Sequence, residues 1–118
     1  MRYEKILQQL EQSQEASRFL DASIALAAGY SRKDAGDGRS AWLNPEGLPV
    51  RKVPLYTKFV QEGRRLADTL LPGEAAAVVW DPDGSGKASV EVGVYHIGAT
   101  PAIALCIAVL STHEKRFD

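Results

Sequence analysis

The 118-residue sequence predicts an α+β domain in which helices pack around a small antiparallel sheet, as a three-layer sandwich. Three observations carry this prediction. Apolar residues recur at helical spacing early in the chain and again near its middle, two short apolar runs flank the turn DPDGSGK, and residues 101–110 are almost entirely apolar. A chain of this length is typical of one domain, here residues 1–118, with one hydrophobic core.

The N-terminal segment predicts a short amphipathic helix. Tyr3, Ile6, Leu7 and Leu10 repeat at i, i+3, i+4 and i+7, with polar residues between them. The polar stretch 11–15 lacks this spacing, so it either separates two helices or bends one.

A second helix is expected to begin after Ser17, whose hydroxyl oxygen can cap its N-terminus. Asp21 then lies near the positive end of the helix dipole, and Leu20 and Ile24 share one face. Gly29 suits the C-terminal end, because glycine readily adopts the left-handed conformation that ends many helices.

Residues 30–55 predict an irregular, structured loop, because glycine and proline are too frequent there for a long regular element. Within it, the stretch 41–49 (AWLNPEGLP) predicts a short strand, a type I turn and a returning strand. Long loops in small domains are either functional or disordered, and apolar residues such as Trp42 indicate that this one packs.

The third helix is expected to begin after Thr57 as N-cap and to end at Pro72-Gly73, with Leu66 and Leu70 on its apolar stripe. A β-hairpin follows, formed by residues 74–80 and 88–95 around the turn.

In the second strand of this hairpin, Val90, Val92 and Val94 alternate with small or polar residues at period two. Thr100 and Pro101 then open a last helix. Because that helix is apolar all round, it belongs at the centre of the fold or under a subunit interface.

Five strings along the chain carry a family resemblance. They are Ser-Arg-x-Leu-Asp at 17–21, WLNPEG at 42–47, Pro-x-Tyr-Thr at 54–57, Leu-Pro-Gly at 71–73 and, most distinctively, ATPAIALC at 99–106. Together they resemble the phage ABA sandwich domain. This resemblance spans nearly the whole chain and implies a small phage- or prophage-encoded protein with helices around a small sheet. It implies no catalytic or binding residues, and the chain departs from the family at 73–77, which lacks a tryptophan-containing stretch.

Composition excludes several classes of protein. The formal net charge of −1 makes duplex nucleic acid an unsuitable main partner, since such binding depends on neutralising many phosphates. The longest apolar run is too short to cross a membrane. The single cysteine, Cys106, can form neither an intramolecular disulfide nor a cysteine-rich metal site, so a reducing cytoplasm is expected.

No motif indicates a metal, a cofactor or a catalytic frame. The turn DPDGSGK fails as a calcium loop because position 12 is Val92, and it fails as a phosphate loop because Asp81 and Ala88 stand where glycine and a hydroxyl residue are required. His96 and His113 have no partner at metal-ligand spacing. We therefore expect a non-enzyme.

Charge is unevenly distributed along the chain. Residues 30–65 hold eight cations and four anions, whereas the remainder holds six cations and eleven anions. Aromatic rings beside cations can stack a base and hold its phosphate. The alternative is that Trp42 and Tyr56 are core anchors and the cations form a solvated face. The candidate ligand-binding residues are Tyr30, Arg32, Lys33, Trp42, Arg51, Lys52 and Tyr56.

Three functions fit this pattern. The first is a phage or prophage accessory protein that binds and sequesters a small anionic, nucleotide-like ligand in the host cytoplasm without turnover. Because so small a monomer has little room for an enclosing pocket, a homo-oligomer would suit this function. The second is a protein-interaction module that blocks a host or defence protein. The third is a nucleotide hydrolase whose residues meet only on folding.

Overall fold

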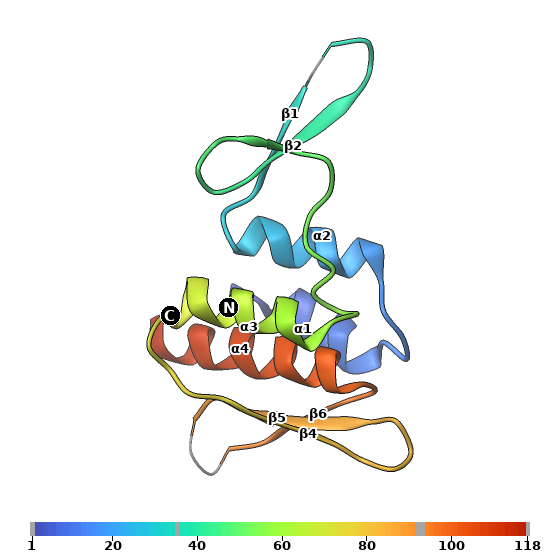
Figure 1. The fold of residues 1–118 in the computed structure, drawn as a ribbon, viewed down its shortest axis with the longest axis vertical. Coiled ribbons are helices and arrows are strands. Elements are labelled where there is room, and N and C mark those ends of the chain that lie inside the picture. Colours follow the sequence, from blue (N-terminus) through green and yellow to red (C-terminus); the bar gives the residue numbers. More distant parts are fainter. Residues whose placement is uncertain (1, 35, 92–93, 118) are drawn as a thin grey trace.

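A computed structural model describes residues 2–34, 36–91 and 94–117. Within these residues, four helices lie between two three-stranded antiparallel sheets (Figure 1). The α+β prediction is confirmed, with the strands divided between two sheets instead of one. The elements are α1 (Glu4–Gln12), α2 (Arg18–Ala27), β1 (Ser31–Asp34), β2 (Ser40–Leu43), β3 (Pro49–Val50), α3 (Val60–Leu70), β4 (Ala77–Trp80), β5 (Gly86–Ser89), β6 (His96–Gly98) and α4 (Pro101–Phe117).

Helix α4 forms the centre of the fold, as its apolar sequence predicts. Every residue from 102 to 110 is buried. The Thr100 hydroxyl oxygen accepts a hydrogen bond from the Ile103 N–H at 3.2 Å, which caps the helix in front of Pro101. The helix continues to Phe117, and its last basic residues, Lys115 and Arg116, are exposed.

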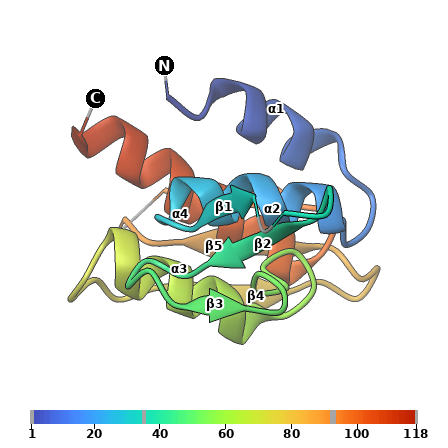
Figure 2. The ribbon, with the colours of Figure 1, turned by 90° about the horizontal axis from the view of Figure 1, so that it is seen from above.

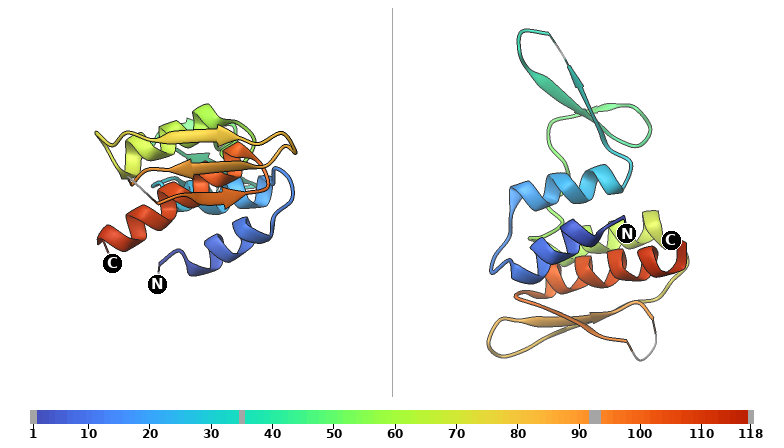
Figure 3. Two further views of the ribbon diagram at one scale, coloured as in Figure 1. Left: turned by 90° about the horizontal axis from the view of Figure 1, so that it is seen from below. Right: turned by 180° about the vertical axis from the view of Figure 1, so that it is seen from behind.

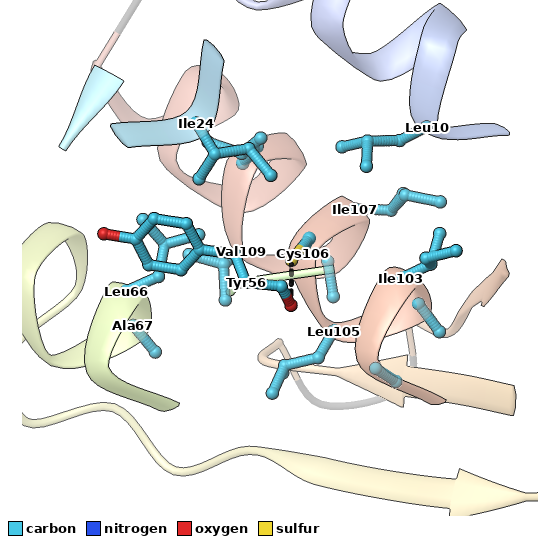
Figure 4. Close-up of a cluster of buried hydrophobic side chains, with 14 of the residues drawn as sticks. Leu10, Ile24, Tyr56, Leu66, Ala67, Ile103, Leu105, Cys106, Ile107 and Val109 are labelled. Carbon is cyan, nitrogen blue, oxygen red and sulfur yellow. Dashed lines mark hydrogen bonds between the residues drawn. The ribbon is translucent and has the colours of Figure 1, made fainter. Parts of the chain in front are cut away.

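Three other helices complete the core around α4. Leu10 of α1, Ile24 of α2 and Leu66 of α3 point toward Ile107, Val109 and their neighbours on α4 (Figure 4). No helix in the described part of the chain is long and apolar enough to cross a membrane.

The sheet formed by β4, β5 and β6, here called sheet B, covers one face of α4 (Figure 1). Two glycines permit this close packing. A Cβ atom on Gly98 would lie 2.5 Å from the backbone nitrogen of Ala104, and one on Gly86 would lie 2.5 Å from the Cα atom of Pro101. A larger residue at either position would separate the sheet from the helix.

The predicted hairpin is confirmed at its turn, where β4 and β5 pair from Ala77↔Ser89 to Trp80↔Gly86. Its second strand is shorter than predicted. Strand β5 ends at Ser89, whose hydroxyl donates to the Glu91 carbonyl, and the chain then turns away from the sheet. Val92, part of the predicted alternation, lies outside the described residues.

The polar stretch 11–15 separates α1 and α2. Ser17 caps α2, because its side-chain oxygen accepts a hydrogen bond from the Leu20 N–H at 3.1 Å. At the other end, Gly29 has φ +102° and the Tyr30 N–H donates to the Ala25 carbonyl. Both predicted ends of α2 are therefore confirmed.

Strands β1, β2 and β3 form a second sheet, here called sheet A, which projects beyond α2 on the side opposite sheet B (Figures 1 and 2). The predicted strand, turn and return over 41–49 are confirmed. The Gly47 N–H donates to the Asn44 carbonyl at 2.8 Å, and the Asn44 side chain accepts from two further N–H groups. Strand β1 was not predicted from the sequence.

The start of α3 corrects the sequence prediction. The helix begins at Val60, and Thr57 does not cap it. Thr57 instead donates through its hydroxyl and its N–H to Asp21, each at 2.8 Å, and accepts from the Ser17 N–H at 2.9 Å. Because Asp21 is only 1 % exposed, these bonds join the start of α2 to the segment before α3.

Candidate functional site

A groove of about 300 Å³ lies between α2 and sheet A. Three parts of the chain form it: the first turns of α2, the paired strands β1 and β2, and the segment that follows β3. We call it the basic groove, and its lining residues are Arg18, Phe19, Ala22, Arg32, Trp42, Arg51, Lys52 and Val53.

The strand pairing of sheet A places a cation on an aromatic ring. Arg32 of β1 stands opposite Trp42 of β2, so their side chains share one face of the sheet. The Arg32 guanidinium carbon lies 4.5 Å from the centroid of the indole ring. This distance fits a cation–π contact, which holds Arg32 over a flat apolar surface.

The other wall is fixed by the bonds between Asp21 and Thr57. They hold α2, which supplies Arg18, near the segment that supplies Arg51 and Lys52. Val53, which is buried, anchors that segment to the body of the protein. The two segments of this wall, α2 and the residues that follow β3, are therefore tied together, although they are distant in sequence.

The basic groove concentrates positive charge. Arg18, Arg32, Arg51 and Lys52 line it, and none of the four forms an ion pair with a carboxylate among the residues that the structure describes. The positive end of the α2 dipole lies at Arg18 and adds to this potential. An anion in the groove would relieve the repulsion between the four cations.

Four of the seven predicted site residues meet in the basic groove, namely Arg32, Trp42, Arg51 and Lys52. Lys33 follows Arg32 along β1 and therefore points to the opposite face of sheet A. Tyr30 is half-buried and lines a neighbouring groove of about 370 Å³ that also contacts Lys52.

Tyr56 lies in the hydrophobic core, not on the surface that the cations share. It is 3 % exposed and packs among side chains of α3 and α4 (Figure 4). Burial, the largest influence, raises the pKa of its hydroxyl well above the ordinary value. The sequence pattern did not distinguish this ring from Trp42, because both are aromatic residues among cations and prolines.

Sequence reasoning missed four lining residues of the basic groove, of which Arg18 and Phe19 offer a charge and an aromatic ring; Ala22 and Val53 are the others. Phe19 is 67 % exposed although it is large and apolar. The Ser17 cap could have identified Arg18 and Phe19, because residues directly after an N-cap lie in the first turn, and neither belongs to the apolar face of α2.

Other reactive groups lie away from the basic groove. The Cys106 thiol is fully buried and donates to the Tyr56 carbonyl at 3.3 Å. Its burial raises the pKa of the thiol, which disfavours a thiolate nucleophile. Among the described residues, no group of three His, Cys, Asp or Glu side chains is placed to hold a metal ion.

Fold and groove together define an α+β domain with an exposed cationic groove that contains aromatic rings. No family model matches the chain, and neither a curated protein nor a solved structure is detectably similar to it.

Proposed function

We propose that this protein binds a small anionic ligand of the nucleotide class in the basic groove. The observation that carries the proposal is the Arg32–Trp42 stack at 4.5 Å among cations that have no carboxylate partner in the described residues. A base would stack on this pair or beside Phe19, and its phosphate would be bound by Arg51, Lys52 and Arg18.

The size and chemistry of the groove support binding without turnover. Its volume, about 300 Å³, falls at the lower end of the range for small-molecule sites. Its lining consists of cations, aromatic rings and small apolar residues, which hold and orient an anion. This lining contains no carboxylate, histidine, cysteine, serine, threonine or tyrosine side chain, so hydrolysis is the weaker proposal.

The proposed setting is the cytoplasm of a host cell, where a phage or prophage accessory protein would sequester the ligand. The resemblance to the phage ABA sandwich domain supports this origin, and the buried free thiol of Cys106 suits a reducing compartment.

Thermal shift and calorimetric titration with a panel of nucleotides and cyclic nucleotides test the proposal. We expect at least one to raise the melting temperature, and Arg51→Ala to lower its affinity by about tenfold or more, as expected for a charge-assisted hydrogen bond. Arg39→Ala removes an exposed cation outside the basic groove and is the matched control. A panel without any stabilising nucleotide would contradict the proposal.

A second candidate function is docking on a host or defence protein through the same surface. The exposure of Phe19 beside the cations favours it, because aromatic residues flanked by arginine are common binding anchors. This function predicts a host protein that co-purifies at a fixed ratio and is lost with Phe19→Ala, while nucleotides leave the melting temperature unchanged. Release of phosphate from any nucleotide by the purified protein would instead favour the hydrolase.

A further inference from the structure

Strand β4 is an unprotected edge of sheet B. Sheet B has the order β4-β5-β6, and α1 lies beside β6 while β4 forms the opposite edge (Figure 3). Residues 75–80 (AAAVVW) contain neither a charge nor a proline. Soluble proteins usually protect such an edge with lysine, proline or a covering segment, because its free backbone groups can pair with another chain.

The hairpin turn shows which backbone groups face this edge. The Asp81 N–H donates to the Ser85 carbonyl at 2.8 Å, so Asp81 belongs to a hydrogen-bonded pair. Antiparallel pairing alternates, so Val79 and Ala77 also bond to β5. The N–H and C=O groups of Val78 and Trp80 therefore point to the free edge.

Trp80 projects from this edge with 79 % of its surface exposed. It stands in register with Gly86, whose face of sheet B packs on the start of α4, so the indole lies on the helical side of the sheet. Exposure of so large an apolar ring to water is unfavourable, so its burial against a partner would stabilise the pair.

A groove that fits an indole runs along the same side of the same edge. It has a volume of about 380 Å³ and lies between α3 and residues 74–78. Val60, Ala67 and Leu105 supply apolar walls, and Ala76 narrows it little because its side chain is small. Arg64 lines the groove and forms no ion pair within the described residues.

We propose that the occupant of this edge is a second copy of the chain. The two β4 strands pair antiparallel about a two-fold axis at Val78, and Trp80 of each copy enters the groove between α3 and residues 74–78 of the other. In this register Val78 pairs with Val78, and Ala76 pairs with Trp80. Val78 and Trp80 present their N–H and C=O groups to the shared edge, and Ala76 continues this alternation just before β4, so three hydrogen-bonded pairs form.

Pro82 and the groove select this register. An axis at Val79 would place Pro82, which has no N–H, opposite Ala76. An axis at Trp80 would place it opposite Val78. An axis at Ala77 would place each indole opposite Glu74, whose carboxylate is bound by Arg116. The axis at Val78 keeps Pro82 out of the three pairs and brings each indole to Ala76 in the groove.

Charge also suits this arrangement. Asp81 stands opposite Ala75 and Glu74 opposite Pro82, so no carboxylate directly faces another. Glu74 is bound by Arg116 at 2.5 Å, and the guanidinium of Arg64 can lie over the entering indole. The dimer is independent of the proposed function, since sheet B and sheet A, which lines the basic groove, lie at opposite ends of the molecule (Figure 1).

Analytical ultracentrifugation across a concentration series tests the dimer. We expect the unmodified chain to be dimeric at micromolar concentration, and Trp80→Ala to raise the dissociation constant at least about tenfold, because buried interface tryptophans contribute strongly to binding. Ala76→Lys, which places a charge in the groove, should also raise the dissociation constant. Ile97→Ala is the matched control, since it removes an apolar residue of 66 % exposure from the far edge strand. A monomer at every concentration, or a dimer unaffected by both Trp80→Ala and Ala76→Lys, would overturn the proposal.

Disulfide trapping tests the register and remains informative if a variant dimerises weakly. The register places Ala77 opposite Val79 of the second copy as a non-hydrogen-bonded pair, with Cα atoms about 4.5 Å apart, within disulfide reach. The double variant Ala77→Cys/Val79→Cys should therefore form a covalent dimer under mild oxidation, whereas Ile97→Cys should not. Equal yields from the two would contradict the register. Buried Cys106 is present in both and does not affect the comparison.

Discussion

Replacing Thr57 by valine removes a hydroxyl that joins α2 to the segment before α3, the two parts of one wall of the basic groove, and it changes the shape of the side chain very little. In the folded protein this hydroxyl donates to the Asp21 carboxyl at 2.8 Å and accepts from the Ser17 N–H at 2.9 Å. The variant would keep only the backbone N–H of residue 57 as a donor to Asp21.

The expected loss follows from these two bonds. A hydrogen bond to an ionised group contributes about 1.5–3 kcal/mol, and a backbone N–H left without a partner costs about 1 kcal/mol or more. Asp21 and Thr57 are each 1 % exposed, so water cannot easily replace the lost partner. We expect Thr57→Val to lower the free energy of unfolding by about 3 kcal/mol, which corresponds to roughly 10 °C in melting temperature for a domain of this size.

Urea denaturation followed by circular dichroism measures this loss. Thr57→Ser keeps the hydroxyl and removes only a methyl group, so it should cost about 1 kcal/mol. Comparing the two variants separates the contribution of the hydroxyl's hydrogen bonds from the contribution of side-chain packing. If Thr57→Val were as stable as Thr57→Ser, the bond network would not join α2 to the segment before α3, and the reasoning would be refuted.

Three further predictions concern other parts of the fold. Gly98→Ala should lower the free energy of unfolding by about 3 kcal/mol, because its new Cβ would lie 2.5 Å from the Ala104 backbone nitrogen. Thermal unfolding measures this loss, and an unchanged melting temperature would contradict the close packing of β6 on α4. Burial lowers the pKa of His96, against an opposing effect of Glu11. The unfolded chain therefore binds the proton more readily, so stability should fall as the pH decreases below about 6.5, and His96→Gln should reduce that fall in urea titrations at several pH values. The Cys106 thiol should react with a thiol reagent at neutral pH only as the protein unfolds, because it is fully buried; rapid labelling of the native protein would show that α4 opens.

The ends of several elements could be predicted because the residues responsible lie close together in sequence. Ser17 and Thr100 cap their helices through bonds to residues three positions further on. Gly29 and the Asn44 turn also depend on local backbone geometry. The strongly apolar segment 102–110 identified the centre of the fold, because no surface position tolerates such a helix.

Features that depend on distant residues were not predictable. Thr57 has the sequence features of a helix cap. Its hydroxyl instead donates a hydrogen bond to Asp21, which is 36 positions away in the sequence. The same limit applies to the site. Arg32 and Trp42 lie near each other because β1 pairs with β2, and β1 was not expected. Tyr56 was misplaced because its environment comes from α3 and α4.

Sheet A stands apart from the part of the protein that secures folding. All four residues of β1 are exposed, and among the three strands Trp42 supplies a packed aromatic side chain to the core. Exchange or lengthening of its loops therefore leaves the stabilising interior intact, because few interior contacts originate there. Sequence changes in sheet A would therefore reshape the basic groove, which Arg32 and Trp42 line, while the helical core stays constant.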